Sequence, residues 1–133
     1  MIVVDASALT DFLLQTRDAV AALARPDGGA LHAPELVDLE TLNALRGMAA
    51  RGVIDDERAT GLAGELASVR MVRYPHGPLR ARVWQLRHQL TAYDASYLAL
   101  AEALDARRLV TSDRGLARRA AAALGSERVE HLG

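Results

Sequence analysis

The sequence contains neither cysteine nor lysine among its 133 residues. Without cysteine the chain can form no disulfide and no thiolate metal site, and it has no thiol nucleophile. Without lysine, Schiff-base chemistry is impossible. A Walker-type phosphate-binding loop is also excluded, because that motif needs a lysine. These two absences remove several classes of covalent enzyme and nucleotide-binding protein, and they leave arginine as the only strongly basic residue.

The chain also has almost no net charge and no long apolar run. The net charge is −1, so the whole chain shows no basic signal for nucleic acid, although a local basic patch is compatible with it. No uninterrupted apolar stretch reaches the roughly 18 residues of a membrane span, and no basic segment typical of a signal peptide opens the chain. Half of the residues are hydrophobic and a quarter are charged. We therefore expect one globular domain over residues 1–133, soluble and cytoplasmic.

Apolar runs alternate with helical patterns along the chain. The runs predict strands at residues 1–5, 30–33, 70–74, 109–113 and 128–132. Three- and four-residue apolar spacing predicts helices at 8–14, 18–23, 35–51, 55–69, 79–89, 93–106 and 115–124. Ser7 and Thr91 are expected to cap helices, and Pro34 is expected at or just before the first turn of the helix over 35–51. The alternation predicts an α/β sandwich around a mainly parallel sheet.

Two aspartates follow similar apolar strands. Asp5 ends the run Ile2-Val3-Val4, and Asp113 ends the run that begins at Leu109. The carboxyl ends of neighbouring parallel strands open onto the same crevice. Both carboxylates would then point into that crevice, although each residue could also simply cap the helix that follows it.

Two more acids are candidates for the same crevice. Glu40 shares a helix face with Asn43, Ala44 and Gly47, which leave room for a carboxylate to face inward. A solvated surface glutamate is the simpler alternative. Asp94 begins a helix whose other positions are almost all apolar. Its negative charge either simply interacts favourably with the positive end of the helix dipole, or it is a buried carboxylate that needs a partner.

Four carboxylates in one crevice would repel one another strongly unless a divalent cation lay among them. Oxygen ligands without a thiolate or a histidine pair favour Mg²⁺ or Mn²⁺, and such sites hydrolyse phosphate esters, commonly with two ions in nucleases. Asp5 would anchor the metal with Asp94, and the other two acids would complete the set. The supporting residues are expected to be Ser7, Asn43, Thr111 and Ser112.

Four segments together resemble the PIN-domain ribonucleases, and specifically the VapC toxins of bacterial toxin–antitoxin pairs. The segments are Val4-Asp5-Ala6-Ser7-Ala8, Glu40 with Asn43-Ala44-Leu45, the run from Leu90 through Asp94 to Ala95, and the run from Leu109 to Ala117. The resemblance implies a three-layer α/β/α sandwich of about five strands and Mg²⁺- or Mn²⁺-dependent RNA cleavage. It also implies a homodimeric toxin neutralised by a small VapB-like antitoxin. No further acid follows Asp113, where Ala117 and Arg118 stand.

Other readings of the acids remain open. A haloacid-dehalogenase-like phosphatase would need a second acid at the position of Ser7 and a distant lysine. A phospho-receiver-like module, which is not an enzyme, also expects a lysine and paired early acids. A PIN domain with a housekeeping role in RNA processing would carry the same four acids as a toxin. A degenerate PIN fold that only binds a partner would have lost one of them.

RNA binding also needs positive charge near the acids. The candidates are the arginines close in sequence to Glu40 or Asp113, namely Arg46, Arg51, Arg114, Arg118 and Arg119, each of which could equally be an ordinary solvated residue. The four histidines lack metal-ligand spacing and are interpreted as structural or surface residues. Trp84 is expected in the core or at an interface.

Overall fold

The computed structural model describes residues 1–133 and is built on a five-stranded parallel sheet in the order β3-β2-β1-β4-β5. The strands are β1 (Ile2–Val4), β2 (Leu31–Pro34), β3 (Met71–Tyr74), β4 (Arg108–Thr111) and β5 (Val129–His131). The predicted mainly parallel, five-stranded sheet is confirmed. Strands β2 and β3 are added on one side of β1, and β4 and β5 are added on its other side. The order of the strands therefore reverses between β1 and β4.

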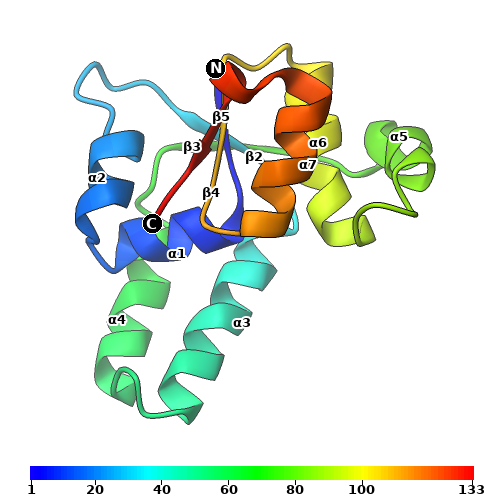
Figure 1. Cartoon of the computed structure of the whole chain (residues 1–133). Coiled ribbons are helices and arrows are strands. Elements are labelled where there is room, and N and C mark those ends of the chain that lie inside the picture. The colour runs from blue at the N-terminus through cyan, green and yellow to red at the C-terminus, as the bar shows by residue number, and fades with distance from the viewer.

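Helices cover both faces of the sheet (Figure 1). They are α1 (Ala6–Leu13), α2 (Arg17–Leu23), α3 (Val37–Ala50), α4 (Asp56–Leu66), α5 (Arg80–Gln85), α6 (Ala92–Ala103) and α7 (Arg114–Leu124), with short 3₁₀ turns at Gly77–Leu79 and Ser126–Arg128. In Figure 1, α1 and α2 lie on one side of the strands and α6 and α7 on the other, while the hairpin of α3 and α4 projects from the sheet. The layers are those of the predicted α/β/α sandwich.

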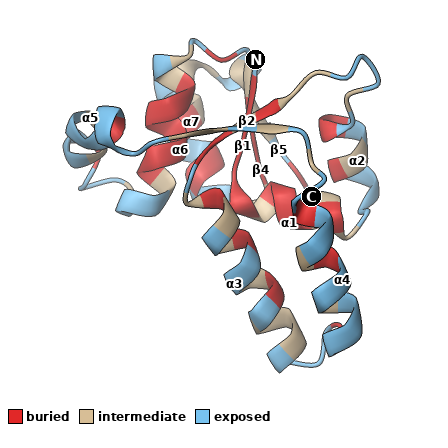
Figure 2. Ribbon diagram, turned by 180° about the vertical axis from the view of Figure 1, so that it is seen from behind, coloured by how far each residue is buried: buried red, intermediate tan, exposed pale blue.

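The core follows from the apolar runs of the sequence. Val3 and Val4 are completely buried, as the continuous Ile/Val run of β1 requires in the centre of a parallel sheet. Every residue of α6 from Ala95 to Ala101 is buried, so this helix is enclosed almost all round. Figure 2 shows this burial on the strands and inner helices, whereas the α3–α4 hairpin is largely exposed. The structure contains no helix with the length and apolar character needed to cross a membrane.

Three local predictions differ from the structure. Ser7 does not cap α1, because Asp5 occupies the N-cap position and accepts the backbone N–H of Ala8. Pro34 is the last residue of β2 rather than part of a helix: it pairs with Tyr74, and α3 begins three residues later, at Val37. The predicted helix over 79–89 is shorter, since the N–H of Leu86 is shared between two carbonyls in a tightened last turn.

The carboxyl edge of the sheet is where the helices begin. Helix α1 follows β1, α3 follows β2, and α7 follows β4. Strands β1 and β4 are paired neighbours, with Val4 opposite Val110. In α/β sheets, ligands bind outside the carboxyl ends of the strands where the strand order reverses. The fold therefore directs attention to the crevice beyond β1 and β4.

Candidate active site

Asp5 is the most deeply buried of the four candidate acids, with 3% of its surface exposed. Its Oδ1 accepts the backbone N–H of Ala8 at 2.9 Å and the hydroxyl of Ser7 at 2.7 Å. Its Oδ2 accepts the hydroxyl of Thr111, which reaches across from β4. Burial raises the pKa of Asp5, the three hydrogen bonds act in the opposite direction, and the charge of Asp113 adds to the rise. These bonds fix the carboxylate firmly in one orientation.

Hydroxyl groups connect the ends of β1 and β4. The Oγ of Ser7 accepts the backbone N–H of Ser112 at 2.9 Å, and the Oγ1 of Thr111 accepts the backbone N–H of Asp113 at 2.9 Å. The side chain of Ser112 points elsewhere, since its hydroxyl donates to Asp11. Ser7 and Thr111 thus support Asp5, whereas Ser112 contributes its backbone to the crevice and its side chain to an acid that sequence reasoning missed.

Glu40 lies in the first turn of α3 and is half-buried. Its Oε1 accepts the hydroxyl of Tyr97 at 2.6 Å. Tyr97 is 1% exposed, and burial together with the hydrogen bond to Glu40 raises its pKa. Sequence reasoning missed Tyr97, although one signal was available: a tyrosine in an otherwise apolar helix needs a partner for its hydroxyl.

Asp94 is half-buried in the first turn of α6, where the Oγ1 of Thr91 caps the helix by accepting the N–H of Asp94 at 3.2 Å. The predicted cap at Thr91 is confirmed. Burial, followed by the charges of Asp113, Asp5 and Glu40, raises the pKa of Asp94 to about 6. Asp94 therefore experiences the fields of all three other candidate acids.

Asp113 is exposed and caps α7, accepting the N–H of Leu116 on Oδ1 at 2.8 Å. It acts on the pKa of both Asp5 and Asp94. The capping role and a place in the crevice were alternatives in the sequence, but in the structure both hold for Asp113 and for Asp5. A carboxylate has two oxygens and about four lone pairs, so one cap bond leaves acceptor capacity free.

The four acids form an electrostatic cluster with no positive partner. None of the five ion pairs in the structure includes one of them. As they stand, no three His, Asp or Glu side chains are arranged closely enough to hold a metal ion. The donor set is nevertheless the one that hard divalent cations prefer, and burial followed by the charges of the other three acids raises the pKa of Asp94. The chemistry of the four side chains therefore fits the ligand set of a Mg²⁺ or Mn²⁺ site.

A cavity of about 450 Å³ adjoins this cluster and contains basic side chains. Ser7 and Ser112 line it on one side, and Arg46 and Arg51 on the other. Asn43 also lines it, but its Oδ1 accepts the Nε–H of Arg46 at 3.2 Å, and no hydrogen bond joins it to an acid. The support of the carboxylates by Asn43 stays a prediction, and in this arrangement the side chain of Asn43 holds an arginine.

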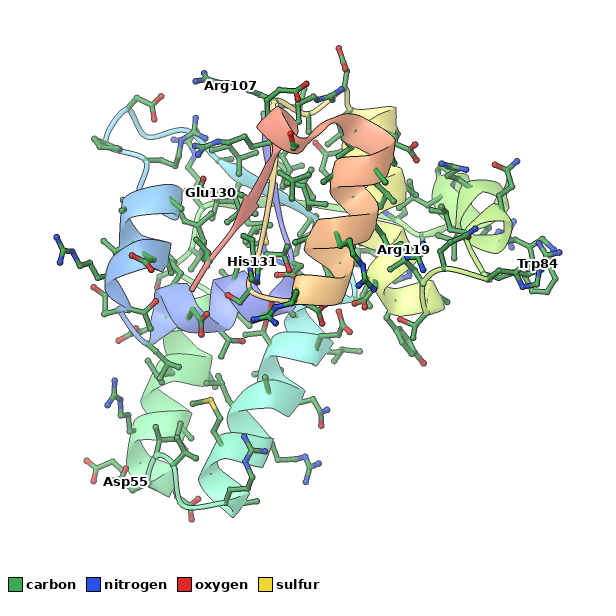
Figure 3. All side chains as sticks on the ribbon, in the orientation of Figure 1. Asp55, Trp84, Arg107, Arg119, Glu130 and His131 are labelled. Atoms are coloured by element: carbon green, nitrogen blue, oxygen red, sulfur yellow. The ribbon has the colours of Figure 1, made fainter.

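The remaining candidates lie on the surface or in structural contacts. Arg114, Arg118 and Arg119 are exposed on α7, the last of them labelled in Figure 3. His32 bonds the hydroxyl of Tyr74 at 2.7 Å, a structural contact. Trp84 is 68% exposed and points away from the body at the outer side of α5, so the core alternative for this residue is wrong.

Comparison with known proteins gives the same assignment. The family model described as PIN domain matches residues 2–122. The chain is 46% identical over 119 residues to VapC ribonuclease Mb0985 of Mycobacterium bovis, an alignment that covers 85% of this chain and 86% of that protein. It is 37% identical over 117 residues to ribonuclease VapC12 of Mycobacterium tuberculosis, covering 88% and 90%. The chain belongs to the PIN domain family, on its VapC branch.

A solved structure agrees with this fold. The crystal structure of PAE2754 from Pyrobaculum aerophilum superimposes with a TM-score of 0.69 at 28% identity, covering 97% of this chain and 82% of that one. The PIN domain described here thus shares its architecture with an archaeal protein over almost its whole length. The four acids of this PIN domain lie on α1, α3, α6 and α7 or directly before them, at one edge of the sheet.

Proposed function

We propose that this protein is a metal-dependent endoribonuclease and the toxin of a VapBC-type toxin–antitoxin system. The observation that carries the proposal is the cluster of Asp5, Glu40, Asp94 and Asp113, electrostatically coupled and without a cationic partner, in a chain with VapC ribonucleases as relatives. Phosphodiester hydrolysis in RNA is the chemistry for which such a carboxylate set is suited.

In the proposed site, some residues would bind the cation and others would position those ligands. Asp5 and Asp94 would hold the cation, with Glu40 and Asp113 completing its ligands. A bound Mg²⁺ or Mn²⁺ supplies positive charge that stabilises a phosphate under attack and makes water a better nucleophile at neutral pH. Ser7 and Thr111 hold Asp5 in place from two sides, and Tyr97 orients Glu40.

The basic side chains beside the cluster are suited to the RNA backbone. Arg46 and Arg51 line the adjoining cavity, and phosphates that leave the cluster on that side would meet them. Both side chains are exposed and form no ion pair. We expect substitution of either arginine to weaken RNA binding more than it slows the cleavage of bound RNA.

A small VapB-like antitoxin is the proposed partner, and a homodimer is the proposed working form, acting in the cytoplasm where RNA is available. A cavity of about 430 Å³ between α3 and α4, lined mainly by apolar side chains that include Leu42, Ala49 and Ala63, supports the docking of a partner segment. The exposed Leu39 and Trp84 are further apolar surface that an assembly would cover.

Cleavage of purified total RNA in Mg²⁺, in Mn²⁺ and in EDTA tests the activity. We expect cleavage with either metal and none in EDTA. Asp5→Asn should lose cleavage, because the amide cannot replace a charged ligand, while Glu57→Gln, which changes an exposed acid on α4, should keep it. Cleavage that persists in EDTA, or full activity of Asp5→Asn, would refute the metal-dependent mechanism.

Induced expression tests the toxin role separately. Wild-type protein should arrest growth, and both Asp5→Asn and Asp94→Asn should abolish the arrest while remaining folded by circular dichroism. Growth arrest that is unchanged in both variants would show that toxicity does not come from this site. RNA cleavage in vitro without any arrest would favour a housekeeping role in RNA processing.

A further inference from the structure

A second pocket lies one helical turn away from the acid cluster. It has a volume of about 220 Å³ and mainly apolar walls, formed by the start of α3, the turn before α5, α5 itself and the start of α6. Leu36 and Leu79 belong to these walls, and Tyr93 lies at the rim with 64% of its surface exposed. The ring of Tyr93 beside this apolar pocket offers a surface on which a flat apolar group can stack.

Two walls of the pocket are tied directly to the cluster. Leu36 lies one turn before Glu40, whose N–H donates to the carbonyl of Leu36 at 3.0 Å. Tyr93 lies one turn before Tyr97, whose hydroxyl holds Glu40 at 2.6 Å. Residues four apart on a helix are neighbours on one face, roughly 5–6 Å apart. The pocket is therefore next to the Glu40–Tyr97 pair.

The segment around the pocket carries positive charge without any acid. Residues 66–93 contain five arginines, at positions 70, 73, 80, 82 and 87, and no Asp or Glu, in a chain whose net charge is −1. Arg73 and Arg82 form ion pairs with Asp38 and Glu102. Arg80, which lines the pocket, forms no ion pair. This charge complements a phosphate chain that passes the pocket entrance.

We propose that this pocket binds one base of a single-stranded RNA, stacked on Tyr93 and next to the bond that the acid cluster cleaves. RNA-binding proteins recognise single strands by splaying bases out and stacking them on aromatic side chains. The apolar walls accept the base, Tyr93 offers its ring, and Arg80 is available for the adjoining phosphate. The assignment rests on the proposed ribonuclease function and adds to it a determinant of where RNA is cut.

Binding to a cleavage-deficient protein tests the pocket without depending on activity. The probe is a labelled RNA pentanucleotide, compared with the same ribose–phosphate chain lacking bases, and the protein is Asp94→Asn with and without Tyr93→Ala. Fluorescence anisotropy should show that the bases tighten binding and that Tyr93→Ala weakens RNA binding by about tenfold or more, the loss expected for one base–aromatic stack. The base-free chain should bind both proteins equally.

Trp84→Ala in the same background is the matched control. Trp84 is as exposed as Tyr93 but lies outside the pocket, with Arg87 stacked 4.6 Å above its ring. Its removal should leave the preference for bases intact. Equal binding of RNA and the base-free chain, or a preference that survives Tyr93→Ala, would overturn the proposal. So would a change in oligomeric state of Tyr93→Ala by light scattering, because the ring would then belong to an interface between copies.

Cleavage of a randomised RNA pool by otherwise wild-type protein gives the second readout. Sequencing of the products should show a preference for certain bases beside the cleaved bond, and Tyr93→Ala should remove this preference. The same variant should have a raised KM and a largely unchanged kcat. If the preference for bases in binding holds but no RNA is cut, the ribonuclease function fails and the base site stands. If RNA is cut with an unchanged profile in Tyr93→Ala, the base site fails and the ribonuclease function stands.

Discussion

Replacing Asp94 by asparagine is expected to stabilise the fold at neutral pH while it abolishes RNA cleavage. Burial and the charges of Asp113, Asp5 and Glu40 raise the pKa of Asp94 from its ordinary value of 3.8 to about 6. The folded state thus binds the proton more tightly than the unfolded chain does. Ionising Asp94 therefore costs free energy of folding, and an uncharged side chain of the same shape avoids that cost.

The size of the effect follows from linkage. The gap between 3.8 and about 6 corresponds to about 3 kcal/mol, at about 1.36 kcal/mol per pH unit. Below about pH 4 the carboxyl group is protonated in both states and the cost is absent; it grows between about pH 4 and pH 6 and is complete above that range. Because the side chain is only half-buried, water screens part of the repulsion, and we expect Asp94→Asn to gain about 1–3 kcal/mol at pH 7.5.

Urea unfolding followed by circular dichroism, in EDTA at pH 3.5, 5 and 7.5, measures the free energies directly. The gain of Asp94→Asn over wild type should rise with pH, while Asp18→Asn, which changes an exposed acid on α2, should stay within about 0.5 kcal/mol of wild type at each pH. Added Mg²⁺ should stabilise wild type and close the gap, because a ligand that binds only the folded state raises its stability. No gain at pH 7.5, or a gain of the same size at pH 3.5, would refute the electrostatic reasoning.

Three smaller changes probe the contacts around the site. Thr111→Val removes the hydroxyl that Asp5 accepts and should destabilise the fold by about 2 kcal/mol in urea unfolding, with loss of cleavage. Asp55→Ala removes the N-cap of α4 and should cost about 1 kcal/mol with cleavage unchanged. Asp38→Asn breaks the partly exposed ion pair with Arg73 and should cost at most about 1 kcal/mol, less at high salt in thermal unfolding.

The parallel sheet and its five strands follow from local patterns in the sequence, whereas the strand order β3-β2-β1-β4-β5 depends on pairings that no local pattern specifies. Strand β1 and most of β4 are buried apolar runs, and the alternation of strands with helices favours a parallel sheet covered by helices on both sides. The ends of helices were less predictable because they depend on backbone hydrogen bonds. Asp5 caps α1 where Ser7 was expected, since the side chain directly after the strand reaches the free N–H groups first.

The side-chain partners within the site could not be predicted, because they join segments far apart in the chain. Tyr97 and Glu40 are 57 positions apart and meet only when α3 and α6 lie at the same edge of the sheet. Asn43 illustrates the same limit of sequence spacing. It shares a helix face with Glu40 by spacing, yet its side chain turns to Arg46, one turn further along its own helix. The spacing of residues along one helix predicts which side chains share a face, but it does not predict their hydrogen-bond partners.

Helix capping at Asp5 and Asp113 would affect how these two residues hold the proposed metal ion. The Oδ1 of each aspartate accepts a hydrogen bond from the backbone N–H three residues further on. That bond fixes the rotation of the carboxylate, so the direction of its remaining lone pairs is fixed as well. Glu40 is too far along α3 to cap it and receives the same restraint from Tyr97. The carboxylate of Asp94 accepts no hydrogen bond, and its pKa is raised, as is that of Asp5. Asp94 is therefore the ligand whose position should change most when a cation binds.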